Sequence, residues 1–504
     1  MKSTIRRDFD TQARVPRVVA ATRSSVLGRG LHQAMHLLRS ILLAGCACAC
    51  TIVHAAVPAA VAQLLAASGI PDSSVGLYVH EIGSAKPLVT HAPEKPLNPA
   101  STMKLVTTYA ALELLGPAYT WSTEVYATGP IRNEVLEGDL VIRGTGDPKL
   151  TLESFWLLLR NLRARGVRDI RGDLVLDRTY FAAGDFDPSR FDGDPLRPYN
   201  TGPDALLVNF KAITVQFVPE LEGQAVRLIS EPTLAPLQVV NAVSLTDGSC
   251  GDWVSRLKFD AQGTADATRL SISGPYARDC GERARSFSVL DHRAYVGALF
   301  AHLWKELGGS VGASVRDGRV PPGARLVMSA TSPQLSEVVR DINKYSNNVM
   351  ARQVFLTLGT LDGAPGTMDK ARNVIRRWLD MKNLSMPELA MENGSGLSRI
   401  ERISARSMGE MLLAAFRSAV MPELIASLPV VAVDGTMRKR LAQAQVAGQA
   451  HIKGGTLTGV RAIAGYVLDA HGRRMVVVFI VNHANAPNAL AAQDALLRWV
   501  YERP

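Results

Sequence analysis

Turn-forming sequence from residue 124 to about residue 290 gives the middle of this chain a different character from its two ends. Gly-Thr-Gly-Asp-Pro at 144–148, Asp-Gly-Asp-Pro at 192–195 and Thr-Gly-Pro at 201–203 separate short runs of β-branched residues. Turn signals at this density indicate short strands, with one predicted helix near 152–165. We therefore predict that 124–290 is an insertion that forms one or two small, mainly β domains.

The flanking segments show helical spacing instead. Residues 101–115 predict a helix that Gly116 and Pro117 end. Further helices are predicted at 291–307, 332–343, 346–360, 367–382 and 404–419, strands at 458–468 and 475–482, and a last helix at about 488–501. Helices on both sides of a terminal strand pair indicate an α+β fold, in which helices pack on an antiparallel sheet.

The N-terminus has the pattern of an export signal. A basic stretch that ends at Arg39 is followed by an apolar run from 41 to 53 and then by small residues. This pattern predicts a signal peptide cleaved before about Ala56, and hence a periplasmic protein. Two alternatives remain open, a start codon at Met35 and a lipoprotein-type site that would leave Cys46 lipidated. No later stretch approaches the length of a membrane span, so we expect at most peripheral membrane association.

Most of the formal net charge of +10 lies in this leader. Residues 1–55 hold eight Lys/Arg and two Asp/Glu, a net of +6, which leaves +4 for the remainder. This mild excess does not indicate a basic surface of the kind that binds nucleic acid. The ten histidines show no metal-ligand spacing, and no glycine-rich phosphate loop is present. We therefore expect no nucleic-acid partner, no metal and no cofactor.

Only two of the five cysteines lie outside the leader. Cys250 and Cys280 stand about thirty residues apart, and both occur in turn-like sequence. In an oxidising compartment such a pair forms a disulfide, which we expect here. The alternative is two unpaired small core residues.

Three short motifs carry candidate chemistry, and the first is Ser101-Thr102-Met103-Lys104 at the start of the predicted helix. Residues three apart share a helix face, so the lysine amine is a neighbour of the serine hydroxyl. A desolvated lysine can serve as the base that activates a serine. The first turn also offers unpaired backbone N–H groups to an oxyanion. Taken alone the motif is weak, because an N-terminal serine and a solvated lysine give the same letters.

The second and third motifs are Tyr345-Ser346-Asn347-Asn348 and Lys453-Gly454-Gly455-Thr456-Leu457. Ser346 is either a helix N-cap or a proton relay at a cleft edge, where Asn348 would hold a peptide. The glycines of the third motif indicate either a loose edge strand or a close approach of ligand to the backbone.

Together the three motifs match the serine-x-x-lysine, serine-x-asparagine and lysine–glycine signature of class A β-lactamases and penicillin-binding proteins. The chain resembles the class C low-molecular-mass penicillin-binding proteins, the D-Ala-D-Ala carboxypeptidase/endopeptidase family. Further shared sequences are Gly144–Pro148, Glu392–Arg399, Asp434–Arg438 and Asn482–Asn485, and about 240 residues separate Lys104 from Ser346. Class A β-lactamases lack such an insertion.

The resemblance implies a β-lactamase/transpeptidase-like catalytic domain built from residues 56–123 and 291–504, with two mainly β domains inserted at 124–290. It also implies a periplasmic hydrolase that cleaves peptidoglycan stem peptides ending in D-Ala-D-Ala and that β-lactams acylate.

The resemblance further assigns roles to single residues. It implies that Ser101 is the acylated nucleophile, that Lys104 is its general base and that Ser346 passes a proton to the leaving D-alanine. It places Asn348, Lys453, Gly455 and Thr456 in substrate binding. Of these, Asn348 would hold the peptide backbone and Lys453 would attract the terminal carboxylate. The oxyanion hole would use the backbone N–H groups of Ser101 and Thr456.

One position departs from the family pattern, which usually reads Lys-Thr-Gly in the third motif. Gly454 removes a hydroxyl expected to bind the substrate carboxylate, and a hydrogen bond to a charged group contributes roughly 1.5–3 kcal/mol. Thr456 lies two residues on, on the same strand face, and could take part of that role. We expect turnover or β-lactam affinity to be reduced, but we expect the protein to remain active.

A β-lactamase and a non-catalytic cell-wall scaffold remain the alternative functions. The balance of carboxypeptidase to endopeptidase activity and the oligomeric state stay open.

Overall fold

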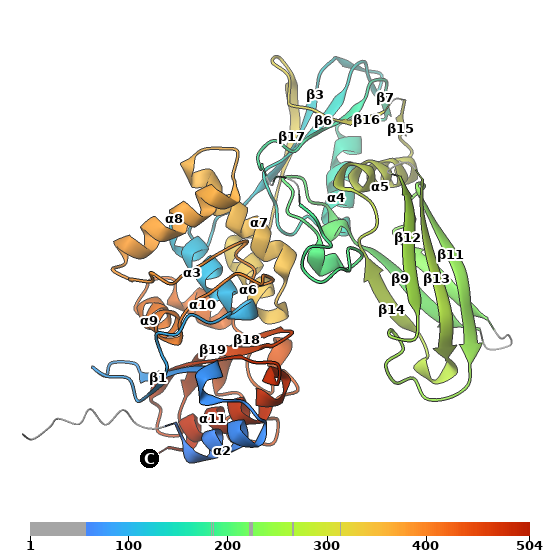
Figure 1. The fold of residues 1–504 in the computed structure, drawn as a ribbon. Coiled ribbons are helices and arrows are strands. Elements are labelled where there is room, and N and C mark those ends of the chain that lie inside the picture. The colour runs from blue at the N-terminus through green and yellow to red at the C-terminus, as the bar shows by residue number, and fades with distance from the viewer. Residues whose placement is uncertain are drawn as a thin grey trace, which may run out of the picture. The chain divides into compact units, whose positions relative to one another are not determined.

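The computed structural model describes residues 57–182, 184, 186–220, 225–264, 267–312 and 314–503 (Figure 1). The predicted signal peptide, its cleavage site, Met35 and Cys46 lie outside the described residues. Within the described residues, no helix is long and apolar enough to cross a membrane.

A five-stranded antiparallel sheet organises both ends of the chain, with the strand order β18-β19-β20-β1-β2. Its strands are β1 (Val75–Glu81), β2 (Val89–His91), β18 (Ala450–Leu457), β19 (Val460–Leu468) and β20 (Arg474–Asn482). The N-terminal strand β1 pairs with the C-terminal strand β20 in the centre, so the catalytic part is one folding unit although its two halves are distant in sequence. β18, which carries the third motif, is an edge strand.

Helices cover both faces of this sheet, as predicted (Figure 1). Two lie on one face, α2 (Ala59–Ala67) and α11 (Leu490–Glu502). The other face is covered by α3 (Lys104–Leu114), α6 (Leu335–Tyr345), α7 (Asn348–Gly359), α8 (Met368–Met381), α9 (Ala405–Phe416) and α10 (Met421–Ser427). Alternation along β1 explains the two layers: Tyr78 packs in the larger helical core, whereas Leu77 and Val79 pack with α2 and α11. The α+β fold class expected from the sequence is thus confirmed.

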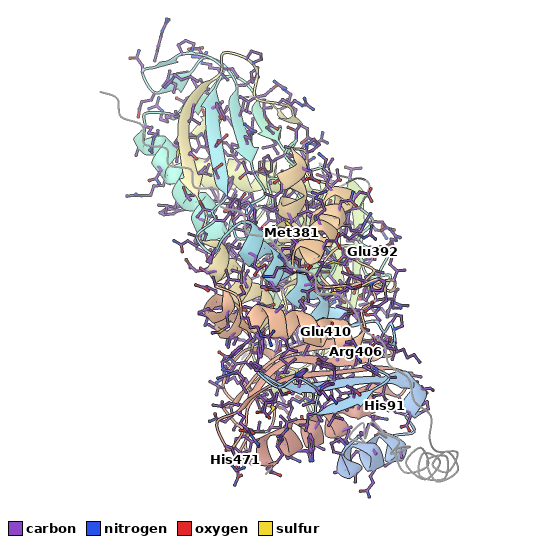
Figure 2. The ribbon with its side chains drawn as sticks, turned by 90° about the vertical axis from the view of Figure 1, so that its left-hand side faces the viewer. His91, Met381, Glu392, Arg406, Glu410 and His471 are labelled. Atoms are coloured by element: carbon purple, nitrogen blue, oxygen red, sulfur yellow. A yellow bond between two sulfur atoms is a disulfide. The ribbon has the colours of Figure 1, made fainter. Side chains whose placement is uncertain are left out.

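The helix α9 lies directly against the sheet (Figure 2). Its polar side carries Arg406 and Glu410, whose side chains are 3.6 Å apart at i,i+4 spacing. Arg406 also pairs with Glu94, so this helix is tied to the loop after β2. Short 3₁₀ turns connect the larger elements: η1 (Asp72–Ser74), η2 (Ala100–Met103), η3 (Pro198–Asn200), η4 (Asn209–Lys211), η5 (Arg278–Cys280), η6 (Thr360–Asp362), η7 (Gly435–Met437) and η8 (Ala486–Ala489).

The middle of the chain forms separate sheets around two further cores. The first core joins a five-stranded sheet (β16-β8-β6-β3-β17) and a four-stranded sheet (β15-β7-β5-β4) with two helices. These elements are β3 (Ser122–Ala127), β4 (Ile131–Arg132), β5 (Val135–Leu136), β6 (Leu140–Gly144), α4 (Leu152–Ala164), β7 (Asp169–Ile170), β8 (Leu174–Asp177), α5 (His292–Glu306), β15 (Ser310–Val311), β16 (Val315–Asp317) and β17 (Arg325–Thr331).

The second of these cores lies between two three-stranded sheets, β10-β9-β14 and β11-β13-β12. Its strands are β9 (Ile213–Pro219), β10 (Val226–Glu231), β11 (Leu237–Thr246), β12 (Lys258–Thr264), β13 (Ala267–Ala277) and β14 (Arg283–Phe287). The expected disulfide between Cys250 and Cys280 is present at the edge of this core, with the two Cα atoms 4.6 Å apart.

The strand pairing bears on where the insertion ends. β17 pairs antiparallel with β3, and α5 packs in the same core as α4, so residues 291–331 belong structurally with the first inserted core. The predicted boundary at residue 290 reflects the return of helical spacing in α5, a pattern that cannot show which core a helix joins. The domain boundaries remain a prediction, and we propose an inserted part that ends near Thr331.

Two polar contacts tie the inserted part to the catalytic part. On α7, the buried Arg352 donates to the carbonyls of Tyr199 and Thr201, at 3.0 and 2.9 Å. Its neighbour Gln353 exchanges two hydrogen bonds with the backbone of Asp204, at 2.9 and 2.8 Å. The segment 199–204 therefore lies against the helix that carries Asn348.

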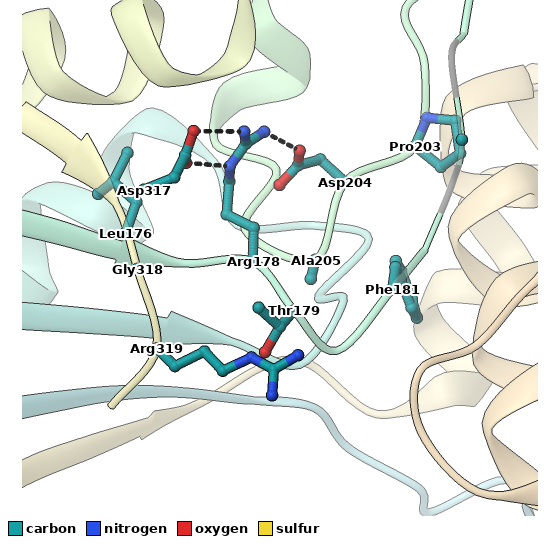
Figure 3. A pocket seen from close by; sticks show the side chains of 11 residues that line it. Leu176, Arg178, Thr179, Phe181, Pro203, Asp204, Ala205, Asp317, Gly318 and Arg319 are labelled. Carbon is teal, nitrogen blue, oxygen red and sulfur yellow. Dashed lines mark hydrogen bonds and ion pairs between the residues drawn. The ribbon is translucent and has the colours of Figure 1, made fainter. Parts of the chain in front are cut away.

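An ion-pair group completes this junction beside a cavity of about 510 Å³ (Figure 3). Arg178 bridges two carboxylates, Asp317 at 2.8 Å and Asp204 at 2.5 Å. Asp204 is nearly buried, so its pairing with Arg178 avoids an isolated buried charge. This arrangement fixes the 203–205 segment against the end of β8.

The disulfide should stabilise the second inserted core without touching catalysis. It closes a loop of about 30 residues, for which the chain-entropy model gives roughly 3–4 kcal/mol. We expect a Cys250→Ala/Cys280→Ala double variant to lose about that much unfolding free energy in urea, and to keep its penicillin labelling. Dithiothreitol should lower the stability of the wild type in the same way and leave the double variant unchanged. A wild type that is insensitive to the reductant would contradict the assignment.

Candidate active site

Ser101 lies in the 3₁₀ turn η2, immediately before α3 begins. The turn is held by the Asn98 side chain, whose Oδ1 accepts a hydrogen bond from the Ala100 N–H at 2.9 Å. Ala100 itself has a positive φ of 46°. Gly396 packs against this bend so closely that a Cβ there would lie 2.0 Å from the Ala100 carbonyl oxygen, and only glycine fits. These contacts fix the backbone from which the Ser101 side chain projects.

The Lys104 side chain is fully buried one helical turn further on. Its Nζ donates to the Ser101 Oγ at 3.0 Å and to the Asn348 Oδ1 at 2.5 Å. A third bond goes to the backbone carbonyl of Ser395. An ammonium group has three hydrogens, so every donor of Lys104 has an acceptor. The neighbour relation expected from the i, i+3 spacing is present.

The electrostatic surroundings favour the neutral form of this amine. Burial, followed by the positive charges of Lys453 and Arg352, holds the pKa of Lys104 well below its ordinary value, while the Glu401 carboxylate acts in the opposite direction. A neutral amine beside a serine hydroxyl can accept its proton. The arrangement is therefore chemically suited to activate Ser101.

Glu401 is a buried residue of this site that the sequence analysis did not find. Its Oε1 accepts from the backbone N–H groups of Glu392, Asn393 and Gly394, each at 3.0 Å. Burial raises the pKa of Glu401, while those backbone hydrogen bonds lower it. The carboxylate thus holds the loop whose Ser395 carbonyl contacts Lys104. The motif Glu392–Arg399 was part of the resemblance, but a role carried by a carbonyl leaves no side-chain signal.

Ser346 lies in the short connection between α6 and α7, with a left-handed φ of 59°. The interpretation of Ser346 as an N-cap is wrong, because Asn347 caps α7 by accepting from the Met350 N–H at 3.0 Å. The Ser346 Oγ instead accepts a hydrogen bond from Lys453 Nζ at 2.9 Å. The second motif therefore faces the third.

The segment that contains Asp434 supports this connection from behind. Lys344, at the end of α6, is buried and pairs with Asp434 at 2.6 Å. The other oxygen of Asp434 accepts from the Val430 N–H at 2.8 Å. Gly435 lies so near the Lys344 carbonyl oxygen that a Cβ would be 2.6 Å from it. The sequence around Asp434 thus helps to position Ser346.

On β18, Lys453 is fully buried and also donates to the Gly454 carbonyl at 2.8 Å. Burial lowers the pKa of Lys453 to about 7. The next residue, Gly455, must be a glycine for a steric reason. A Cβ there would lie 2.7 Å from the Pro99 carbonyl oxygen and 3.0 Å from the Ser101 nitrogen. The strand therefore packs directly against the turn that carries Ser101. Gly454 faces open space instead, since a Cβ at that position would meet no atom within 4 Å.

A cavity of about 330 Å³ opens in front of these groups. Four of the predicted site residues line it: Ser101, Ser346, Gly455 and Thr456. Lys104, Asn348 and Lys453 lie behind the two serines, through the hydrogen bonds described above. Within the part of the chain that the structure describes, no group of His, Cys, Asp and Glu side chains could hold a metal ion.

A hydroxyl beside a buried lysine, a second serine–lysine pair opposite and a glycine strand at the edge define a class of protein. This fold and site are those of a serine hydrolase of the low-molecular-mass penicillin-binding type. Residues 57–502 match the family model described as the D-Ala-D-Ala carboxypeptidase 3 (S13) family. The chain belongs to this family of carboxypeptidases.

Individual relatives agree with the family model. A D-alanyl-D-alanine carboxypeptidase from Actinomadura sp. (strain R39) is 29% identical, over 84% of this chain and 80% of the relative. The D-alanyl-D-alanine carboxypeptidase DacB from Haemophilus influenzae is 25% identical, over 81% of this chain and 85% of the relative. Among solved structures, penicillin binding protein 4 from H. influenzae superimposes with a TM-score of 0.75, at 23% identity, over 88% of this chain and 99% of the other. That likeness supports the α+β fold with its inserted β domains.

The open space at Gly454 makes a stringent test of the third motif. A Gly454→Thr variant should restore a hydroxyl beside the cavity without a steric clash. We expect its acylation by benzylpenicillin to be faster by roughly one to two decades, measured as the second-order rate of adduct formation. Gly455→Thr is the matched control, and should lose labelling because its side chain would meet the backbone of Pro99 and Ser101. An unchanged rate in Gly454→Thr would contradict the assignment.

The two lysines predict a bell-shaped pH dependence of acylation. The rate should rise with pH as Lys104 loses its proton and becomes able to accept one, since its pKa is lowered. It should fall as the pH rises through about 7, where Lys453 loses the charge that attracts a carboxylate. The measurement is the penicillin acylation rate from pH 5 to pH 10, with circular dichroism at each pH. A Lys453→Met variant should be slower and lack the falling limb. A wild-type rate that keeps rising to pH 10 would contradict this prediction.

Proposed function

We propose that the protein is a periplasmic serine peptidase that removes the terminal D-alanine from peptidoglycan stem peptides through an acyl-enzyme on Ser101. The observation that carries this proposal is the 3.0 Å contact between the Ser101 Oγ and the buried amine of Lys104. A serine hydroxyl is a weak nucleophile unless an adjacent base takes its proton. Membership of the D-Ala-D-Ala carboxypeptidase family supports the proposed activity. The contact supports Ser101 as the nucleophile and Lys104 as its base.

In the acylation step, the Ser101 oxygen attacks the carbonyl carbon of the penultimate D-alanine while its proton passes to Lys104. The oxyanion that forms is stabilised by the backbone N–H groups of Ser101 and Thr456. Support for this pair comes from the close packing of β18 on η2, where a Cβ of Gly455 would lie 3.0 Å from the Ser101 nitrogen. Donors that are fixed before the reaction cost no reorganisation when the charge appears.

Collapse of the intermediate breaks the peptide bond and leaves an ester on Ser101. The departing amine of the terminal D-alanine takes its proton from Ser346, which the Lys453 ammonium contacts at 2.9 Å. The proton that Lys104 took from Ser101 passes to Ser346 in turn, so Lys104 is neutral again when the terminal D-alanine leaves. Water then attacks the ester while Lys104 accepts a proton from it. Lys104 returns this proton to the Ser101 oxygen as the ester bond breaks and the peptide acid leaves. The same sequence cleaves a D-alanyl cross-link when the leaving amine belongs to a neighbouring stem, which is the endopeptidase reaction.

One cation and one amide group lie directly behind the two serines and are the candidates for substrate binding. Lys453 provides a cation for the terminal carboxylate, and Asn348 an amide for the peptide backbone. Asn348 is already oriented by its 2.5 Å contact with Lys104, so substrate binding and base placement share one side chain. β-Lactams carry a strained amide and a carboxylate in a similar relation, so they should acylate Ser101 in place of the peptide.

Export to the periplasm is part of the proposal. It is supported by the signal-like pattern before Ala56 and by the Cys250–Cys280 disulfide, since disulfides persist in oxidising compartments. Cleavage before Ala56 would leave every element of the described fold in the mature chain, because α2 begins at Ala59.

A fluorescent penicillin tests the proposal directly. The wild type should form one covalent adduct, which peptide mass mapping should place on Ser101, and Ser101→Ala should form none. Ser84→Ala, at an exposed serine in a turn, is the matched control and should label like the wild type. Absence of any adduct in a folded wild type would overturn the enzyme assignment and favour the scaffold. Loss of the adduct within seconds, with nitrocefin turnover, would favour the β-lactamase.

A further inference from the structure

The cavity in front of Ser101 contains an arginine that the family's motif does not include. Arg461 lies on β19, directly opposite Thr456 in the antiparallel register with β18. Residues opposite each other project to the same face of a sheet. Gly454 is two residues from Thr456 and shares that face. Arg461 therefore stands on the side of the sheet where the threonine hydroxyl of the usual motif is missing, and it lines the same cavity as Gly454.

The guanidinium of Arg461 is only partly used by the protein. Its Nη1 donates to the Thr456 Oγ1 at 3.0 Å and its Nη2 to the Pro487 carbonyl at 3.4 Å. Its Nε is buried and has no hydrogen-bond partner in the structure. A buried donor without an acceptor is costly, so a ligand that supplies an acceptor would be favoured. Among the described residues, no carboxylate forms an ion pair with Arg461.

The other cations of the cavity are already engaged. Arg440 pairs with Asp494 at 2.5 Å and also contacts Gln493, so its charge is neutralised locally. Lys453 is fully buried behind Ser346 and does not line the cavity, although its charge lies nearby. Arg461 thus contributes a positive charge that the surrounding side chains do not compensate, in a cavity open to the substrate.

We propose that Arg461 binds the terminal carboxylate of the substrate, on the face of the sheet where Gly454 lacks a hydroxyl. The inference rests on the proposed function, because the carboxylate is that of the terminal D-alanine. A guanidinium presents several N–H groups in a plane and suits a carboxylate better than a single hydroxyl does. Thr456 joins it: its oxygen accepts from Arg461, which leaves its own hydrogen to donate to the same carboxylate. Arg461 is therefore a specificity residue that requires a negatively charged end on the substrate.

A pair of substrates that differ only at that end tests the inference. In an acyl-D-Ala-D-Ala peptide, Arg461→Ala should lower kcat/KM by roughly ten- to a hundredfold, the range for a lost charged hydrogen bond. For the corresponding C-terminal amide, the same variant should change kcat/KM less than about twofold, because no carboxylate is present. Arg498→Ala, on the exposed side of α11, removes an equal charge and should leave both values unchanged.

A second substitution distinguishes carboxylate binding by Arg461 from a structural role of this residue. Because a hydroxyl at position 454 would bind the same carboxylate, Gly454→Thr should restore much of the lost carboxylate activity in an Arg461→Ala background. An equal loss for acid and amide substrates would indicate a structural role and overturn the inference, as would no loss for either. Penicillin labelling of Ser101 in the wild type is measured alongside: its absence would defeat the proposed function itself, whereas labelling with an indifferent Arg461→Ala defeats only this inference.

Discussion

The burial of one amine is the constraint on which the rest of the site depends. Lys104 lies in the core with three hydrogen-bond acceptors and, among the described residues, no carboxylate at ion-pair distance. A buried charge without a counter-ion is unfavourable, so the pKa of the amine falls and the neutral form becomes accessible. The cost of burying Lys104 thus makes its unprotonated form available to accept a proton. Since its acceptors come from η2, α7 and the loop at Ser395, the fold must bring three distant segments to one atom.

Backbone contacts at two glycines make this convergence sterically feasible. Gly396 allows the Ser395 loop to lie on the bend at Ala100, and Gly455 allows β18 to lie on the turn at Ser101. Any side chain at either position would push its segment away from the nucleophile, and a displacement of about 1 Å is enough to lose a catalytic contact. The inserted part contributes on the far side, where Arg352 and Gln353 bind segment 199–204 to the helix that carries Asn348. The insertion is therefore connected to the catalytic helix through polar contacts and is more than an appended domain.

The buried lysines of the site differ from Arg461 in their exposure and in how firmly they hold their charge. Lys104 and Lys453 are fully buried, and burial lowers the pKa of both amines. Arg461 is half-buried at the entrance, where a guanidinium stays charged at any relevant pH. The buried lysines can therefore change protonation during the reaction, whereas Arg461 keeps its positive charge throughout. The departure at Gly454 fits this division, because Arg461 still offers a permanent positive charge to a carboxylate where the strand lacks a hydroxyl.

The sequence by itself predicted most of the long helices, the last two strands, the turn-rich insertion and the three motifs, and it favoured the Cys250–Cys280 pairing. Such features are local, since the period of apolar residues and the position of turn formers are written along a few consecutive residues. Only the tertiary structure decided that α5 and β15–β17 join the inserted core, that Ser346 adopts a left-handed conformation, and that Glu401 holds the Ser395 carbonyl against Lys104. These outcomes depend on backbone atoms and on residues far apart in the chain, whose meeting is set by packing. A carbonyl group is the same in every residue, so its role is fixed by where the fold places it.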